Sequence, residues 1–464
     1  MSELLWASAK AFLIALVLTP IVRDIFRSYN VVDRPGRRKV HAFPIPRVGG
    51  IAIAVAFTAA LVSFSDLSSS LPAWDSPVWK LLPGAAIIFV TGLSDDFFDL
   101  SPRWKLAGEI GAAVAVFFNG LSIAAIAGLE LPVWLSLPIT IVWLLLCTNA
   151  FNLIDGLDGL CAGMGFVATL ALFCAAQLHS NFALAYATLP LAGALLGFLC
   201  YNFNPATVFL GDSGALLIGF LLGCYGMIWT DKTATLVSVA VPLLAISIPL
   251  LDALLSIVRR FLGRRPIFGA DRGHIHHRLL DLGLSPRRAV LSLYLFGALV
   301  AALALLLSHP RSRGYQWMLI ALVCLVAWAG VRQLRYAEFE VAGKLLFGGE
   351  LQRALGVQVR TAQLAAALDR SRSEEQWWSA VIAAARDAGC IGVRWIGEGR
   401  TREQILTDRT AAWSFHVILP DGETIQLDGA LPAAQSSVDL IGFGEAISRS
   451  IAGKRRDWTQ PALS

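Results

Sequence analysis

Apolar runs of about twenty residues recur along most of this chain and constrain its fold more than any other feature. A helix of about 20 apolar residues crosses the hydrocarbon layer of a bilayer, which is about 30 Å thick. We count about eleven such runs: 4–22, 48–66, 79–94, 106–128, 132–148, 160–178, 182–200, 213–229, 235–257, 289–308 and 315–334. Only 15% of the residues are charged, whereas soluble domains contain about 25%. The sequence predicts an all-α polytopic membrane protein with about eleven transmembrane helices, the first of them a retained anchor.

Basic residues concentrate in alternate loops between these runs. The first loop contains seven Lys or Arg residues and the ninth contains eight, whereas the even-numbered loops contain only scattered ones. Short cytoplasmic loops carry an excess of Lys and Arg. We therefore expect a multi-pass protein of the cell (inner or plasma) membrane, with its N-terminus outside and its odd-numbered loops and C-terminal tail in the cytoplasm.

The polar sequence clusters also fall in odd-numbered loops. They are DRPGRRKVH (33–41), SDDFFD (94–99), NAFNLIDGLDG (149–159), NFNPATVFLGDSG (202–214) and DRGHIHHR (271–278). The fifth and seventh loops contain no Lys or Arg, so the charge bias does not explain why the clusters share one side. We expect the five clusters to form one active site on the cytoplasmic face.

Closely spaced carboxylates characterise three of these loops. They are Asp95, Asp96 and Asp99 in the third loop, Asp155 and Asp158 in the fifth, and Asp212 in the seventh. Such carboxylates repel one another, and a set of oxygen ligands favours Mg²⁺ or Mn²⁺ over Zn²⁺. Asn149 and Asn152 share a helix face with Asp155 and add neutral oxygen ligands. The alternative is that Asp155 or Asp212 lies before a helix and caps its start.

Basic and small residues near the carboxylates indicate a phosphate ligand. Arg38, Lys39, Arg47, Lys105 and the Arg/His group at 272–278 could hold a diphosphate, and the neighbouring glycines let backbone amides approach an anion. The HIHH sequence has the spacing of a zinc half-site, but no Cys or fourth partner accompanies it. The chain contains no GxxxxGKS, HExxH or GxSxG motif, so P-loop, metalloprotease and esterase chemistry are not indicated.

The five clusters resemble the motifs of the polyprenyl-phosphate N-acetylhexosamine 1-phosphate transferases (glycosyltransferase family 4). The matching segments, in the family order over about residues 1–335, are DRPGRRKVHAFPIPRVGG (33–50), DDFFDLSPRWK (95–105), NAFNLIDGLDGL (149–160), NFNPATVFLGDSG (202–214) and DRGHIHHRLL (271–280). The resemblance implies that a polyprenyl phosphate attacks the β-phosphorus of a UDP-N-acetylhexosamine with Mg²⁺ as cofactor. UMP leaves, and a polyprenyl diphosphate sugar forms at the cytoplasmic leaflet.

The resemblance also implies roles for individual residues. The catalytic carboxylates would be Asp95, Asp96, Asp99 and Asp155, with Asp95 as the base for the lipid phosphate. Asn152 and Asp212 would hold the metal. The substrate-binding residues would be Lys39, Arg47, Lys105, Asp158, Phe209, Arg272, His274, His276 and His277. Among these, Phe209 would stack on uracil and Asp158 would bond its edge.

The histidine motif resembles that of the N-acetylglucosamine branch of the family. HIHHRLL follows DRG, and RRKVH lies in the first loop, whereas lipid I synthases carry a longer histidine run followed by an acidic residue. We therefore expect UDP-N-acetylglucosamine and undecaprenyl phosphate as substrates, in the first membrane step of a cell-envelope polysaccharide such as O-antigen. The alternatives are a UDP-N-acetylmuramoyl-pentapeptide phosphotransferase and a transporter or flippase for a lipid-linked sugar, although a transporter would place acids mid-helix in related halves.

The composition changes after Arg335. Residues 336–464 are richer in charge and contain no apolar run long enough to span a membrane. Amphipathic helices at 349–370 and 373–389, strands at 390–399, 411–422 and 423–431, and a last helix at 437–453 predict a small cytoplasmic α+β domain of unknown role. The order of elements resembles a small GAF-like sensor, although no motif supports a ligand. We favour a structural or dimerisation module over a ligand sensor, and a dimerisation module would make the chain a homodimer. We expect no nucleic-acid partner.

Overall fold

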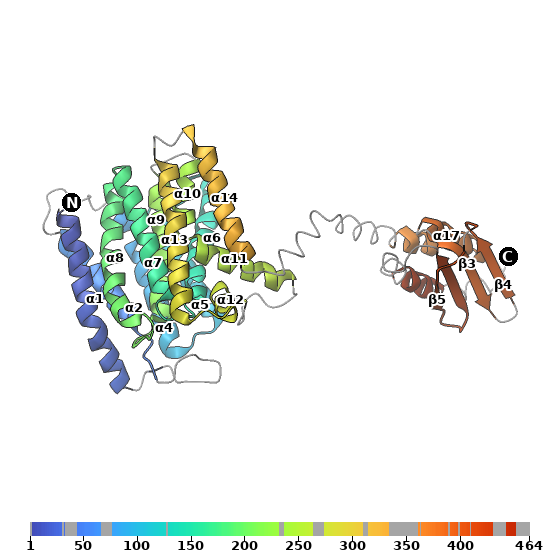
Figure 1. The fold of residues 1–464 in the computed structure, drawn as a ribbon, viewed down its shortest axis with the longest axis horizontal. Coiled ribbons are helices and arrows are strands. Elements are labelled where there is room, and N and C mark those ends of the chain that lie inside the picture. Colours follow the sequence, from blue (N-terminus) through green and yellow to red (C-terminus); the bar gives the residue numbers. More distant parts are fainter. Residues whose placement is uncertain are drawn as a thin grey trace. The chain divides into compact units, whose positions relative to one another are not determined.

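The computed structural model divides the chain into two compact units, Met1–Arg335 and Tyr336–Ser464. It describes residues 2–29, 32, 44–65, 77–126, 129–231, 236–262, 273–309, 314–333, 361, 363–387, 390–397, 400–408, 410–429 and 442–451. The predicted site residues Lys39 and Arg272 lie outside these described ranges. The first unit is a bundle of helices, and the second contains a small sheet (Figure 1).

The helices of the first unit follow the apolar runs of the sequence. They are α1 (Ser2–Ser28), α2 (Gly49–Ser65), α3 (Pro77–Lys80), α4 (Leu82–Phe98), α5 (Pro102–Phe118), α6 (Val133–Ile154), α7 (Leu160–Leu178), α8 (Phe182–Asn202), α9 (Gly211–Asp231), α10 (Leu236–Ala245), α11 (Ser247–Leu262), α12 (Ile275–Asp281), α13 (Pro286–Ser308) and α14 (Gln316–Gln333). A hairpin of two short strands, β1 (Ala125–Ile126) and β2 (Leu129–Glu130), separates α5 from α6.

Within the described ranges, seven helical segments are long and apolar enough to cross a membrane. Shorter apolar helices occur in α2, α11 and α14. The helix α9 lies at the centre of the bundle, because 94% of its most apolar 18-residue stretch is buried. The corresponding share for α1, at the edge, is 28%. The chain is therefore a multi-pass membrane protein. Seven segments meet the full length criterion, while the expected total of about eleven spans stays a prediction.

Besides the one-residue turn at Leu81 between α3 and α4, two apolar runs do not form single continuous helices as expected. The run at 106–128 is helical only to Phe118, where the N–H groups of Gly120 and Leu121 bond back to the carbonyls of Phe117 and Val116 and close the helix. The run at 235–257 divides into α10 and α11. Pro249 explains this break, because its ring clashes with the carbonyl four residues earlier in a continuous helix.

The second unit contains an antiparallel sheet packed against helices. Its elements are α17 (Glu374–Asp387), β3 (Cys390–Gly397), β4 (Arg400–Ile405), β5 (Trp413–Ile418) and β6 (Thr424–Gly429), with further helices at 363–370 and 442–451. The strand order is β4-β3-β6-β5. The core joins Trp377 of α17 to Val393, Leu427 and Ile447. The sequence did not predict β4, because this edge strand is largely exposed and shows no apolar alternation.

We expect Trp377→Ala to loosen the second unit. Trp377 is fully buried, and its indole N–H donates to Ser450 Oγ at 3.1 Å. Truncating such a core aromatic costs about 3–5 kcal/mol. The variant should therefore be cleaved faster by trypsin between β3 and β6, whereas Trp377→Phe should be cleaved at an intermediate rate. Cleavage of Trp377→Ala at the wild-type rate would contradict this core assignment.

Candidate active site

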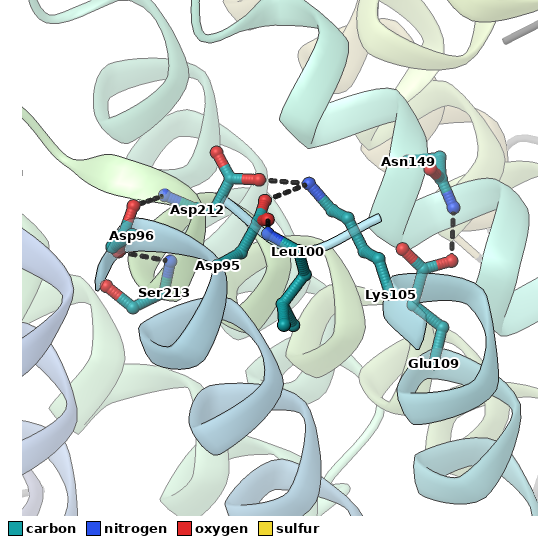
Figure 2. Close-up of polar contacts among 8 residues, drawn as sticks. All are labelled: Asp95, Asp96, Leu100, Lys105, Glu109, Asn149, Asp212 and Ser213. Atoms are coloured by element: carbon teal, nitrogen blue, oxygen red, sulfur yellow. Dashed lines mark hydrogen bonds and ion pairs between the residues drawn. The ribbon is translucent and has the colours of Figure 1, made fainter. Parts of the chain in front are cut away.

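The carboxylate of Asp96, in the last turn of α4, binds the first N–H groups of α9 (Figure 2). The Asp212 N–H donates to Oδ1 at 2.7 Å, and the Ser213 N–H donates to Oδ2 at 3.0 Å. The first N–H groups of a helix have no partner within it and carry partial positive charge. Asp96 therefore fixes the start of α9 against the end of α4.

The ammonium group of Lys105, on α5, lies between two carboxylates (Figure 2). It donates to Asp95 Oδ2 at 3.1 Å and to Asp212 Oδ2. The second oxygen of Asp95 accepts the Leu100 N–H at 2.8 Å. The side chains of Asp95 and Asp212 are 17% and 29% exposed, so both carboxylates remain accessible to a ligand. Three helices thus bring Asp95, Lys105 and Asp212 into direct contact.

The turn between α6 and α7 carries Asp155 and Asp158. Asp155 directly follows the last residue of α6, where a negative charge opposes the helix dipole. Burial raises the pKa of Asp155 to about 8, and the nearby charges of Asp212, Asp96 and Asp158 act in the same direction. Neither Asp155 nor Asp212 is an N-cap: Asp155 ends a helix, and Asp212 lies in the first turn of α9. The capping alternative is therefore wrong for both residues.

The carboxylate of Asp158 binds the loop that leads to α9. Its Oδ2 accepts the Asn204 side-chain amide and the Ala206 N–H, each at 3.0 Å. The expected role of Asp158 at the uracil edge stays a prediction. The contact shows instead that Asp158 holds this loop against the turn between α6 and α7.

The segment before α2 pairs with the segment before α9. Arg47 and Phe209 form a parallel bridge, in which the Phe209 N–H donates to Pro46 O at 2.8 Å. Gly211 follows with a φ of +76°, and a Cβ at this position would lie 2.7 Å from Asp96 Oδ2. Only glycine fits both the left-handed backbone and the adjacent carboxylate. Arg47 is exposed and Phe209 is half-buried beside this carboxylate cluster.

The histidine motif packs against the turn that carries Asp155. A Cβ on Gly156 would lie 2.4 Å from His276 Nε2, so the ring directly contacts this glycine. The rings of His274 and His276 are parallel with centroids 5.7 Å apart, and the ring of His277 lies 4.3 Å from that of His276. Burial and the neighbouring His277 lower the pKa of His276 to about 4, so this ring is neutral at pH 7.

Contacts therefore connect four of the five sequence clusters, together with residues 44–50 that follow the first, at one end of the bundle, whereas residues 33–41 of the first cluster lie outside the described ranges. Arg47 pairs with Phe209, Lys105 binds Asp212, Asp158 binds the loop before α9, and His276 contacts Gly156. Asn152 is half-buried in the last turn of α6. Asp99 differs from the others: it is exposed, ends α4 with a φ of +47°, and makes no side-chain hydrogen bond to another described residue.

Two buried acids outside the sequence clusters, each in contact with a residue of one cluster, were not predicted from the sequence. Asp252 of α11 is 1% exposed; it accepts the Ile275 N–H at 2.8 Å and lies 3.1 Å from His274 Nδ1. Glu109 of α5 is 3% exposed and accepts the side-chain amide of Asn149 at 2.7 Å. The available signal was a single acid inside an apolar run, since such residues are costly in a membrane and usually functional.

The carboxylate cluster fits a divalent cation of the Mg²⁺ type. Among the described residues, no three His, Cys, Asp or Glu side chains form a ready ligand set for a metal. Mg²⁺ does not need one, because it usually takes one or two protein carboxylates and completes its shell with water and substrate phosphates. Asp95, Asp96 and Asp212 with Lys105 leave two formal negative charges in the cluster, which a divalent cation would neutralise.

Known proteins resemble this chain over about two thirds of its length. A family model described as Glycosyl transferase family 4 matches residues 78–230. A probable undecaprenyl-phosphate N-acetylglucosaminyl 1-phosphate transferase of Bacillus subtilis (strain 168) is 34% identical over 303 residues, which cover 64% of this chain and 83% of the relative. A decaprenyl-phosphate N-acetylglucosaminephosphotransferase of Mycobacterium tuberculosis (strain H37Rv) is 34% identical over 345 residues, covering 67% and 84%. An undecaprenyl-phosphate alpha-N-acetylglucosaminyl 1-phosphate transferase of Escherichia coli (strain K12) is 28% identical over 330 residues, covering 68% and 86%.

We expect Asp155→Asn to flatten the pH dependence of stability. The pKa of Asp155 is about 8 in the folded chain against 3.8 for an ordinary aspartate. Between these values the folded state holds a proton that the unfolded state releases, so wild-type stability falls as pH rises, by at most about 1.4 kcal/mol per pH unit. Melting temperatures in detergent from about pH 5 to about pH 9 should therefore decline less steeply in the variant. Equal slopes would contradict the shift.

We expect Asp252→Ala to release the helix that carries the histidines. The change leaves the buried Ile275 N–H and His274 Nδ1 without their acceptor, and each unpaired buried group costs about 1–3 kcal/mol. Amide hydrogen exchange over Ile275–Asp281 should accelerate. Asp252→Asn keeps an oxygen for the Ile275 N–H and should show a smaller acceleration. Unchanged protection of α12 in the alanine variant would show that Asp252 does not hold it.

Proposed function

We propose that this chain, which belongs to glycosyl transferase family 4, the polyprenyl-phosphate N-acetylhexosamine 1-phosphate transferases, transfers N-acetylglucosamine 1-phosphate from UDP-N-acetylglucosamine to undecaprenyl phosphate. An oxygen of the lipid phosphate attacks the β-phosphorus of the donor. The bond from that phosphorus to the oxygen bridging it to UMP breaks, and UMP leaves with the electron pair. The product is undecaprenyl diphosphate N-acetylglucosamine.

The observation that carries this proposal is the contact of Lys105 with both Asp95 and Asp212 at the ends of apolar helices. A reaction between two phosphates brings negative charges together, so a site for it must supply cations. Lys105 supplies one, and the carboxylates can hold a divalent ion as the second. The location at helix ends also suits an acceptor whose phosphate lies at the membrane surface.

The two adjacent aspartates of α4 would have different roles. Both oxygens of Asp96 are used by the N–H groups of α9, so Asp96 positions Asp212. Asp95 is proposed as the base that takes any remaining proton from the lipid phosphate. Its hydrogen bonds from Lys105 and the Leu100 N–H favour the ionised form that a base requires.

The remaining proposed roles concern the donor. Asp212 and Asn152 would hold Mg²⁺, which when bound would neutralise the donor diphosphate and the leaving UMP. Arg47, Phe209 and the histidines at 274, 276 and 277 lie around the same end of the bundle and would hold the nucleotide and phosphates. We also propose that this end faces the cytoplasm, which leaves the N-terminus outside, and that the reaction begins a cell-envelope polysaccharide.

The test is a transfer assay on the full chain in detergent. With radiolabelled UDP-N-acetylglucosamine, undecaprenyl phosphate and Mg²⁺, we expect lipid-soluble label and an equal amount of UMP. Asp95→Asn and Asp212→Asn should each lower kcat by about 10²–10⁴-fold, as expected for loss of a base or of electrostatic stabilisation. Glu130→Gln, an exposed change on β2, is the matched control and should keep normal turnover.

The same assay separates the competing functions. A flippase would release no UMP. Faster turnover of UDP-N-acetylmuramoyl-pentapeptide, or of another UDP-N-acetylhexosamine, would replace the proposed donor while keeping the reaction. Near-normal turnover in both aspartate variants would remove Asp95 and Asp212 from the site.

A further inference from the structure

We propose that Glu109 is a positioning residue that orients the side chain of Asn149, so that the amide oxygen faces the divalent cation of the site. This inference rests on the proposed function for the identity of that cation. Figure 2 shows Glu109 and Asn149 on the side of Lys105 opposite the aspartates. Glu109 belongs to none of the sequence motifs and makes no hydrogen bond to the aspartate cluster, and we propose that it acts through its hydrogen bond with Asn149.

The first step is the burial of Glu109. Its side chain is 3% exposed within α5, one turn after Lys105. A buried carboxylate is costly unless its oxygens are paired. Among the described residues, the hydrogen-bond partner of Glu109 is a neutral amide at 2.7 Å rather than a basic residue. An ion pair is thus not the reason for placing an acid here, and the hydrogen bond itself becomes the candidate role.

The second step is the direction of this hydrogen bond. A carboxylate only accepts, so the NH₂ end of the Asn149 amide must face Glu109. The same nitrogen donates to Leu145 O at 3.0 Å in the preceding turn of α6. Both N–H bonds of the amide are therefore used. The amide oxygen, which has no hydrogen-bond partner among the described residues, is the only group that Asn149 can offer to a ligand.

The third step is the place of that oxygen. Asn149 is half-buried on α6, one turn before Asn152 and on the same face. Neutral amide oxygens are ordinary ligands for hard cations. Without Glu109 the amide could rotate and turn its NH₂ group toward the cation, where it would repel rather than bind. Loss of a partner that orients a metal ligand typically costs about 10–100-fold in metal affinity or activity.

The experiment is a double-mutant cycle on the full chain in detergent, with Glu109→Leu, Asn149→Ala and the double variant. The first readout is the Mg²⁺ concentration at the midpoint of the Mg²⁺-induced rise in melting temperature, without donor or lipid. The second is kcat/KM for transfer. We expect Glu109→Leu to shift both by about 10-fold or more, and to have no further effect once Asn149 is alanine. Glu109→Gln, which retains an accepting oxygen, should restore most of both.

Thr140→Val is the matched control. It removes a buried hydrogen bond on the same helix, from the Ile123 N–H at 3.0 Å, at the end near the hairpin. It should lower the melting temperature without moving the Mg²⁺ midpoint. Additive effects of Glu109→Leu and Asn149→Ala, or a Mg²⁺ midpoint that is absent or unchanged in Glu109→Leu, would overturn the proposal. A coupled shift of the midpoint in a chain without transferase activity would overturn the proposed function and leave the role of Glu109 standing.

Discussion

The pairing of the Asp96 carboxylate with the first N–H groups of α9 organises the rest of the site. This carboxylate lies at the end of α4 and joins that helix to the start of α9. The two residues in contact, Asp96 and Asp212, are 116 positions apart in the sequence. The start of a helix carries positive partial charge, so a carboxylate is bound there without a basic side chain. The backbone of Asp212 is fixed by this contact, and its own carboxylate remains available to Lys105. Gly211 permits the close approach that this arrangement requires.

The balance of charge explains why the acids are tolerated next to lipid. Asp95 and Asp212 share one ammonium group, and backbone dipoles offset the charge of Asp96. Burial, together with the charges of Asp212, Asp96 and Asp158, raises the pKa of Asp155. Charges at the end of a membrane helix cost less than at its centre, where insertion scales give about 2.5–3.5 kcal/mol. The cluster therefore retains a negative surplus that is large enough to attract a divalent cation and small enough to allow folding.

Much of the helical architecture was predictable because length and hydropathy alone decide which segments can span a membrane. The convergence of the clusters was predictable from loop parity, which places alternate loops on one side whatever their sequence. The break at Pro249 was readable in principle from the ring's clash with a preceding carbonyl, but an apolar count does not register it. The edge strand β4 gave no signal, since an exposed strand needs no apolar alternation. Partners were also unpredictable: helix capping by Asp212 was only an alternative to its metal role, and nothing in the sequence indicated that the first N–H groups of α9 bind Asp96 from a distant segment.

Glu109 and Asp252 show how rigid helices control irregular segments. Each is a buried acid on a membrane helix, and each accepts hydrogen bonds from a residue of a motif that it does not belong to: Asn149 in one case and Ile275 in the other. A turn or short helix at the membrane surface has few apolar contacts of its own, so its side chains would otherwise sample several orientations. A hydrogen bond from such a segment to a carboxylate inside the bundle restricts the segment to one orientation, because the bundle itself is rigid. Burying a carboxylate is energetically costly, and the hydrogen bond with the motif residue offsets this cost only while that residue stays in place. Displacement of the motif would therefore destabilise the helix, and loosening of the helix would displace the motif.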